Sequence, residues 1–190
     1  MKHGRIENDR RSIRLPGYDY TQTGAYFITI CTAERQCLFG GVNHKERSLR
    51  PSPIGELVID CWESIPDHFP DVELDEFVFM PNHFHGILII AGQQKHGRRS
   101  PIYLRNAEAF GKPVQRSIPT IVRSFKSAVS RRNANEGVGA SRPIWQRNYY
   151  ERVIRTENEL DEIRMYISEN PAQWSEDPEN PAVMKNSLAP

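Results

Sequence analysis

The sequence predicts one α+β domain with an antiparallel sheet, and three observations lead to that fold class. Four short segments are rich in β-branched and aromatic residues, a composition that favours strands. Three other segments repeat apolar residues at the spacing of an amphipathic helix. The two kinds alternate as strand, helix, strand, strand, helix, strand, helix, and 190 residues suffice for one domain with a buried core.

The first strand is predicted at residues 26–32, which read Tyr-Phe-Ile-Thr-Ile-Cys-Thr. A charged loop rich in turn residues is expected after it, through Pro51. Ser52 and Pro53 then indicate a helix start, because a hydroxyl can cap the helix and proline is favoured at its first position. Apolar residues recur over three turns, and Pro66 is expected to end this helix.

A hairpin is predicted at the centre of the chain, with strands at 73–80 and 83–91 joined by a turn at Pro81-Asn82. Because side chains alternate across a strand, His83 and His85 should share one face while Phe84 faces the other side. Two imidazoles on neighbouring same-face positions can converge on one ion. The alternative is that both are structural histidines at the start of a strand.

The next segment, residues 92–115, is polar and basic, and a loop of this length in a compact domain is usually functional or disordered. Helical spacing returns at Ile118 and continues to Val129. A flexible link is expected at 133–141, followed by an aromatic-rich strand at 143–154.

The last helix is predicted to begin at Thr156, where Thr-Glu-Asn-Glu matches a capping box. Asn170-Pro171 is expected to close it, because proline disfavours helical geometry in the residue before it. The remainder, which includes Trp174, is expected to be an extended tail.

The first six elements match the ferredoxin-like βαββαβ pattern, an antiparallel sheet with two helices on one face. Both faces of the strand at 83–91 carry apolar residues, so both faces should be covered. The C-terminal helix is therefore expected to lie over the histidine face. The predicted organisation is a basic N-terminal arm at 1–23, a single domain at 24–174 and a C-terminal tail at 175–190.

Composition indicates a reducing compartment and an anionic partner. Three cysteines without metal-type spacing favour a cytoplasmic protein without disulfides. No apolar run reaches membrane-spanning length, and no signal peptide is expected. The formal net charge is only +1, but basic residues cluster in the arm, in 95–132 and in 142–155.

Basic clusters of this kind suit a nucleic acid bound on one surface, although a solvated surface is the simpler interpretation of each. The residues predicted to contact DNA are Arg10, Arg11, Arg14, Arg98, Arg99, Arg123, Lys126, Arg131, Arg132 and Arg147.

Tyr166 and Asn170 lie four residues apart in the last helix, so they should stand on one side of it. Each has an ordinary interpretation, as a half-buried core tyrosine and a helix-terminal asparagine. Above two same-face histidines they instead suggest a phenol nucleophile beside a metal ion. A phenol has a pKa of about 10 and attacks poorly without help. A divalent ion can stabilise the leaving oxygen, and Mg²⁺ or Mn²⁺ suits imidazole and amide oxygen ligands.

Three blocks, residues 80–86, 144–155 and 166–171, resemble the signature blocks of single-tyrosine HUH transposases. The chain is most similar there to the REP-associated tyrosine transposases, over residues 11–174. The resemblance implies a metal-dependent single-stranded DNA endonuclease and strand transferase that forms a 5′-phosphotyrosine link. It implies that His83 and His85 are metal ligands and that Tyr166 is the nucleophile. Asn170 stands where relatives place a third ligand, often glutamine.

The implied partner is single-stranded or hairpin DNA, including repeated extragenic palindromes, bound by a monomer or homodimer. Tyr166 could complete the site of its own chain or of a partner. Tyr149 and Tyr150 are rival tyrosines, interpreted as sheet packing. Two other functions stay open: a non-catalytic single-stranded nucleic-acid-binding module, and a phosphodiesterase that uses activated water.

Overall fold

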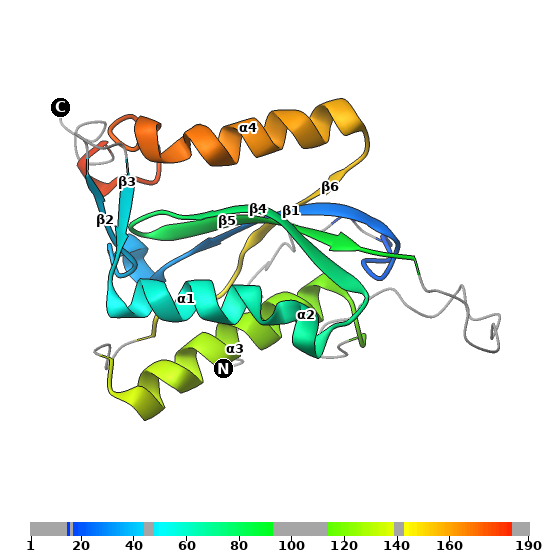
Figure 1. Cartoon of the computed structure of the whole chain (residues 1–190), viewed down its shortest axis with the longest axis horizontal. Coiled ribbons are helices and arrows are strands. Elements are labelled where there is room, and N and C mark those ends of the chain that lie inside the picture. The colour runs from blue at the N-terminus through cyan, green and yellow to red at the C-terminus, as the bar shows by residue number, and fades with distance from the viewer. Residues whose placement is uncertain (1–14, 16, 44–47, 93–113, 139–142, 184–190) are drawn as a thin grey trace, which may run out of the picture.

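The computed structural model describes residues 15, 17–43, 48–92, 114–138 and 143–183. It contains a four-stranded antiparallel sheet between two layers of helix (Figure 1). Two long helices, α1 and α3, cover one face, and the C-terminal helix α4 crosses the other. The elements are β1 (Gly24–Cys31), the 3-10 turn η1 (Ala33–Arg35), β2 (Gly40–Asn43), β3 (Ser48–Pro51), α1 (Pro53–Glu63), α2 (Ile65–His68), β4 (Val72–Phe79), β5 (His83–Ile90), α3 (Ile118–Glu136), β6 (Tyr150–Ile154) and α4 (Glu157–Gln173).

The strand order β4-β5-β1-β6 is the order that a ferredoxin-like βαββαβ chain produces. Strand β5 pairs with β4 on one side and β1 on the other, and every pairing in this sheet is antiparallel. The predicted fold class, including an additional helix over the histidine face, is therefore confirmed.

Helix starts follow the local signals in the sequence. Ser52, Ser117 and Thr156 each accept a hydrogen bond from the backbone N–H three residues onward, as N-caps do. In the predicted capping box, the Glu159 carboxylate accepts from the N–H of Arg155 at 2.8 Å. The glutamate therefore reaches one residue beyond the usual partner, the N-cap itself.

The two faces of the sheet have separate cores. On the α1–α3 side, Trp62, Phe84 and Phe125 are buried together, with ring centroids 4.6–5.7 Å apart. Gly86 lies under this cluster, where a Cβ would come within 2.5 Å of the Trp62 ring. Glycine at this position therefore leaves room for the ring of Trp62 in the core.

The second core lies under α4 and is smaller. It joins Leu160, Ile163 and Ile167 of the helix to Phe27 and Ile87 of the sheet. The helix is also tied to the edge strand β4, because Arg164 donates two hydrogen bonds to the Asp75 carboxylate, at 2.6 and 2.9 Å.

Two predictions for the first half of the chain are wrong. The loop expected through Pro51 contains the hairpin of β2 and β3. The first helix ends at Glu63, and Pro66 lies inside the short helix α2. Proline is tolerated there because the first residues of a helix have no intrahelical partner for their N–H groups.

The last predicted strand is shorter than expected, since only 150–154 join the sheet. Trp145 makes one isolated bridge to Thr32, and the carbonyl oxygens of Gln146 and Arg147 accept from the Lys126 ammonium group at 2.6 and 3.3 Å. Bonding to a side chain and burial of Trp145 in the helix-side core hold this segment outside the sheet.

Helix α4 does not close at Asn170 but continues through Pro171 to Gln173. Proline inside a helix removes one hydrogen bond, and burial of Trp174 just beyond it helps to offset that loss. Trp174, Asp177 and Asn180 are all buried, so the segment 174–183 is packed against the domain rather than extended. Within the part of the chain that the structure describes, no helix is long and apolar enough to cross a membrane.

Candidate functional site

The two histidines of the central strand lie side by side under α4, with ring centroids 4.6 Å apart. His83 and His85 are 0% and 4% exposed, and most buried polar side-chain atoms have a hydrogen-bond partner. Their positions follow from the register, in which Cys31 and Thr29 of β1 stand opposite them. The predicted sharing of one face is confirmed, and Phe84 packs in the core of the opposite face.

Asn82 fixes the orientation of the His83 ring. Its side-chain amide donates to the carbonyl oxygens of Arg35, at 3.1 Å, and Glu179, at 2.6 Å. Its Oδ1 is thereby left to accept from His83 Nδ1 at 2.9 Å. His83 therefore carries its proton on Nδ1 and presents an Nε2 lone pair, and this buried Nε2 has no hydrogen-bond partner. Burial, with His85 and Arg35 nearby, lowers the pKa of His83 to about 2.

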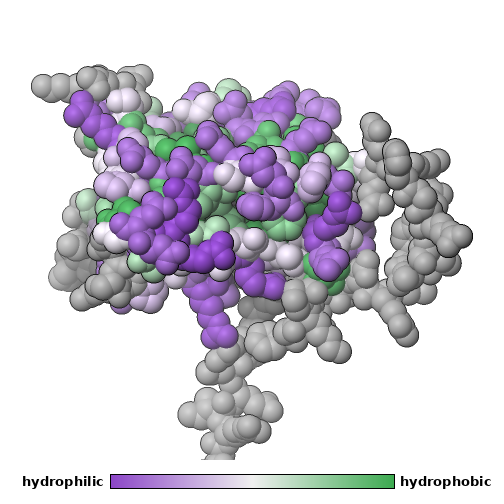
Figure 2. All heavy atoms as spheres, turned by 60° about the horizontal axis from the view of Figure 1, so that its bottom comes forward, coloured by the Kyte–Doolittle hydropathy of each residue, from purple (hydrophilic) through white to green (hydrophobic). Residues whose placement is uncertain are grey.

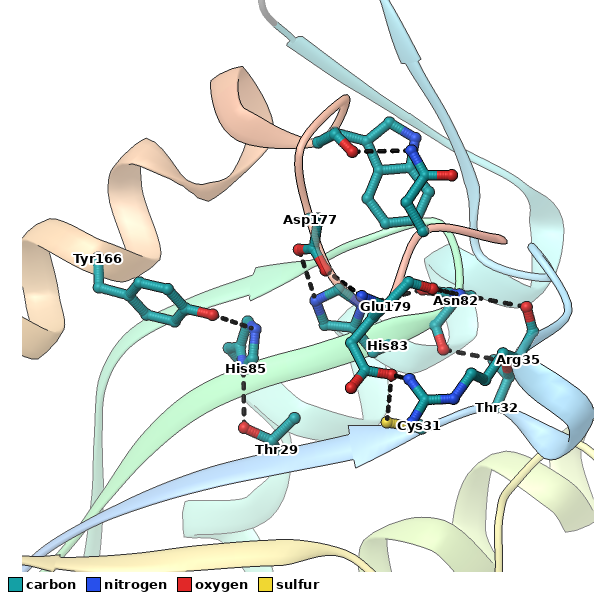
Figure 3. Close-up of polar contacts among 12 residues, drawn as sticks. Thr29, Cys31, Thr32, Arg35, Asn82, His83, His85, Tyr166, Asp177 and Glu179 are labelled. Carbon is teal, nitrogen blue, oxygen red and sulfur yellow. Dashed lines mark hydrogen bonds and ion pairs between the residues drawn. The ribbon is translucent and has the colours of Figure 1, made fainter. Parts of the chain in front are cut away.

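His85 is held between the sheet and α4 (Figure 3). Its Nδ1 lies 2.8 Å from Thr29 Oγ1 and its Nε2 lies 3.3 Å from the Tyr166 hydroxyl. The ring also stacks on Phe27 at 5.3 Å between centroids. Burial lowers the pKa of His85 to about 4, so this imidazole too is neutral near pH 7.

Tyr166 projects from α4 toward His85 (Figure 3). Its ring is 45% exposed, and it meets Phe27 edge-on with centroids 6.1 Å apart. Burial of the hydroxyl and the charge of Asp177 raise the pKa of Tyr166, while a hydrogen bond with Asn170 lowers it. Tyr166 and His85 therefore meet within one chain.

Asn170 lies one turn beyond Tyr166 on the same side of α4 and is 3% exposed. Its Oδ1 is buried and has no hydrogen-bond partner. A buried amide oxygen without a donor is costly, and such an atom in a native site calls for a missing partner.

The segment 174–183, expected from the sequence to be a tail, covers the site beside His83. The Asp177 carboxylate is 7% exposed and its Oδ2 lies 3.7 Å from His83 Nε2 (Figure 3). Burial raises the pKa of Asp177 to about 6, with Arg35 acting in the opposite direction. The signal for this packing in the sequence was Trp174, a large aromatic residue in a segment otherwise rich in polar residues.

A second link to this segment comes from the turn η1. Arg35 forms an ion pair with Glu179, whose backbone oxygen also holds Asn82. Glu34 and Arg35 both have φ of 53°, a left-handed conformation that is uncommon for residues other than glycine. Sequence patterns gave no indication that this turn would support the site.

The donor atoms available for a metal ion are of mixed type. Among the described residues, no three or more His, Cys, Asp and Glu side chains form a group that could hold a metal ion. The buried Asn170 Oδ1 is a further donor atom of another type. Because His83 Nε2 and Asn170 Oδ1 are buried without hydrogen-bond partners and both imidazoles are neutral, these residues fit a divalent ion.

Half of the residues predicted to contact DNA, Arg10, Arg11, Arg14, Arg98 and Arg99, lie outside the described residues. The other half are on or beside α3, across the sheet from the histidines. Figure 2 turns this side of the molecule forward and shows hydrophilic residues over much of it.

These basic residues differ in how far their own chain engages them. Arg123, Arg131 and Arg147 are exposed. Lys126 bonds to two backbone carbonyls, and its burial lowers its pKa to about 8. Arg132 pairs with Asp60 at 3.3 Å and with Glu136 at 2.8 Å. Lys126 and Arg132 are therefore less available to a phosphate than the three exposed arginines.

The rival tyrosines have different environments. Tyr149 is half-buried and packs against the helix-side core, as expected. Sheet packing was the wrong expectation for Tyr150, which is 49% exposed. Tyr150 stands opposite Thr29, which in turn stands opposite His85, so it lies on the histidine face of the sheet.

The solved structures that are similar to this chain include the following two. One is a REP-associated tyrosine transposase bound to a REP hairpin, with 17% identity, coverage of 95% of this chain and 87% of that chain, and a TM-score of 0.48. The other is a protein of Deinococcus radiodurans R1 provisionally described as a transposase, with 20% identity, coverage of 88% and 96%, and a TM-score of 0.45.

No family model matches this chain. An uncharacterised protein of Haemophilus influenzae is 43% identical to it over 171 residues, which cover 88% of this chain and 91% of that protein. Identity at this level over nearly the full length of both proteins indicates common descent. This chain therefore belongs to the same family as the Haemophilus influenzae protein.

Proposed function

We propose that this chain is a metal-dependent single-stranded DNA endonuclease and strand transferase with Tyr166 as its nucleophile. In this proposal His83, His85 and Asn170 hold a Mg²⁺ or Mn²⁺ ion beside the tyrosine. The observation that carries the proposal is the 3.3 Å approach of the Tyr166 hydroxyl to His85 Nε2, within a set of buried donor atoms. The tyrosine hydroxyl thus meets one neutral imidazole directly, beside a second neutral imidazole whose buried Nε2 has no hydrogen-bond partner.

Helix α4 supplies the placement that attack requires. A nucleophile must be held about 3–3.5 Å from the reacting atom and in line with the leaving group. Leu160, Ile163 and Ile167 anchor α4 in the core, and the Arg164–Asp75 ion pair ties it to the edge strand. With its backbone fixed in this way, Tyr166 keeps its hydroxyl at the histidines although its ring is half exposed.

The reaction that follows is a transesterification. The Tyr166 oxygen attacks the phosphorus of a phosphodiester, an oxygen–phosphorus bond forms, and the bond from phosphorus to the 3′ oxygen breaks. The phenol proton ends on the released 3′ hydroxyl, and the 5′ phosphate stays on the tyrosine. The phosphoester energy is kept in this link, so a second 3′ hydroxyl can attack it and rejoin a strand.

Because burial raises the pKa of Tyr166, the phenol is a weak nucleophile in the free protein. A bound divalent ion supplies Lewis-acid polarisation of the phosphodiester and charge stabilisation of the leaving oxygen. Asn82 and Thr29 contribute by orienting the two imidazoles from the far side of each ring.

The proposed substrate is single-stranded or hairpin DNA, including repeated extragenic palindromes, as the sequence blocks imply. Exposed arginines at 123, 131 and 147 offer phosphate contacts on the opposite side of the sheet. A hairpin that reaches from these arginines to Tyr166 would wrap an edge of the domain.

The test is covalent capture of the intermediate. Purified full-length protein is incubated with single-stranded oligonucleotides and Mn²⁺, and denaturation-resistant adducts are mapped by peptide mass spectrometry. The expected adduct is on Tyr166, and it should be absent with EDTA. Tyr150→Phe is a matched control, because Tyr150 is another exposed tyrosine of the same sheet face and should not be required. An adduct on Tyr149 or Tyr150 would refute the assignment, and cutting without any adduct would indicate water as the nucleophile.

A further inference from the structure

The segment 174–183 brings a carboxylate to His83 that the proposed ligand set does not include. Asp177 is 7% exposed, and its Oδ2 lies 3.7 Å from His83 Nε2, which is fully buried and has no hydrogen-bond partner. Its other oxygen, Oδ1, accepts from the Glu179 N–H at 2.6 Å. This hydrogen bond orients the carboxylate so that Oδ2 is the atom directed at the histidine.

The contact between Asp177 and His83 is not a hydrogen bond. Its length of 3.7 Å exceeds the usual range of about 2.7–3.2 Å. Because His83 Nδ1–H donates to Asn82 Oδ1, the other ring nitrogen of His83 directs a lone pair at Asp177, and the carboxylate oxygen directs another lone pair back. Two electron-rich atoms facing one another across a buried gap repel, unless a cation lies between them.

The spacing is close to the one that two ligands of a single ion adopt. Metal bonds from nitrogen or oxygen are about 2.0–2.2 Å long, so neighbouring donor atoms lie about 3 Å apart on an octahedral ion and about 3.5 Å apart on a tetrahedral one. The distance of 3.7 Å from His83 Nε2 to Asp177 Oδ2 is slightly longer, so a small shift of the carboxylate would bring both atoms onto one ion. Arg35 is the nearby cation, but its ion pair is with the carboxylate of Glu179.

The charge of a divalent ion is a second argument for Asp177 as a ligand. The proposed ligands His83, His85 and Asn170 are all neutral, so they leave both positive charges of a divalent ion uncompensated in a largely buried site. Mg²⁺ and Mn²⁺ prefer hard oxygen donors, and carboxylates are their usual protein ligands. Asp177 is the buried carboxylate that faces this donor set in the described structure.

We propose that Asp177 is a ligand of the divalent ion, together with His83. This inference rests on the proposed function for the presence of that ion. In the present structure His83, His85 and Asp177 do not converge as a group of three, because His85 Nε2 is directed at the Tyr166 hydroxyl. His83 and Asp177 are therefore the preformed part of the site, and the segment 174–183 is a component of it.

The experiment measures ion binding directly. Full-length protein is stripped with EDTA and titrated with Mn²⁺, and free Mn²⁺ is followed by electron paramagnetic resonance. The wild type should bind one ion at this site, and His83→Ala should lose it. Asp177→Asn, which keeps the shape and removes the charge, should weaken binding at least tenfold. Glu176→Gln is the matched control, because it removes the same charge from an exposed neighbour in the same segment and should bind Mn²⁺ like the wild type.

Folding is checked in the same proteins, since Asp177→Asn should unfold in EDTA at the same denaturant concentration as the wild type. Equal Mn²⁺ affinity of Asp177→Asn and wild type would overturn the inference, and faster DNA cleavage by that variant would then make the segment a cover over the site. Absence of a Mn²⁺ site that depends on His83 would overturn it as well. Weaker Mn²⁺ binding by Asp177→Asn in a protein that forms no DNA adduct would support Asp177 as a ligand while removing Tyr166 as the nucleophile.

Discussion

The two faces of the central strand β5 (His83–Ile90) differ in what they bury: one faces an apolar core and the other a polar site. Toward α1 and α3, Phe84 packs against Trp62 and Phe125 in a core of aromatic and aliphatic side chains. Toward α4, His83 and His85 bring ring nitrogens into a buried space where His83 Nε2 and Asn170 Oδ1 have no partner. One face of the strand therefore contributes to the stability of the fold, and the other holds buried polar atoms without partners. Mutation of a residue on the first face should lower stability, whereas mutation of the next residue along should affect the proposed metal binding and cleavage.

The largest effect should come from Tyr166→Phe on the α4 face. Loss of the hydroxyl removes the proposed nucleophile, so adduct formation and cleavage should fall about 10³-fold or more. The ring keeps its packing on Phe27, so the midpoint of thermal unfolding should barely move. Gel assays of the adduct and calorimetry on the same preparation measure both. Retention of cleavage by this variant would contradict the assignment of Tyr166 as the nucleophile.

A second effect, on stability, should appear across the same strand. Phe84→Ala should lower the free energy of unfolding by about 3–5 kcal/mol, because it opens a cavity beside Trp62 and Phe125. His83→Asn keeps a polar side chain near Asn82 and removes an Nε2 that bonds to nothing, so it should cost less than about 1 kcal/mol. Urea unfolding in EDTA compares the two. Similar losses for both variants would mean that the histidine serves the fold as much as the phenylalanine does.

Gly86→Ala tests whether a change in the core under α1 and α3 affects the α4 face. A Cβ at this position would lie 2.5 Å from the Trp62 ring and 2.8 Å from the Phe84 ring, so both must shift. Overpacking of this kind costs about 1–3 kcal/mol. Since neither ring touches the α4 face, Mn²⁺ affinity should stay at the wild-type value once the protein is folded. A loss of Mn²⁺ binding in the folded variant would show that the two faces are coupled.

The smallest effect should be on the salt dependence of DNA binding. Replacing the exposed Arg123 and Arg131 by glutamine should lower the slope of log affinity against log salt by about 0.7–0.9 for each phosphate that the protein no longer neutralises. Arg132→Gln is the control, because Arg132 already pairs with Asp60 and Glu136. Fluorescence anisotropy with a labelled hairpin gives the slopes. Equal slopes in the wild type, the Arg123 and Arg131 variant and Arg132→Gln would mean that the basic residues of α3 do not contact DNA phosphates.

Local patterns were enough to predict the sheet and its helices. Alternation in the β5 segment placed His83 and Phe84 on opposite faces, and apolar content on both faces required a helix over each. Capping residues such as Ser52 and Thr156 located helix starts to within a residue. These features are determined by residues that are close together in the sequence, so they can be predicted from a single sequence.

The parts that patterns missed depend on contacts between residues far apart in the chain. Asp177 reaches His83 from a segment whose composition favours a turn or tail, and only the folded chain shows it to be buried. The continuation of α4 through Pro171 depends in the same way on where Trp174 packs. Arg132 and Lys126 were counted as free basic residues because their partners, Asp60 and the carbonyl of Gln146, come from other elements.

The position of Asn82 has a consequence for how the proposed activity would be lost. This buried side chain holds His83 from one side, while its own amide is held by carbonyls of Arg35 and Glu179. Segments near the surface open at lower free energy than the core strands of a domain. Detachment of the segment that carries Glu179 would release both Asn82 and the carboxylate beside His83, yet leave the aromatic core intact. Mild denaturant should therefore inactivate a chain that still retains its native circular dichroism spectrum, so that inactivation precedes unfolding.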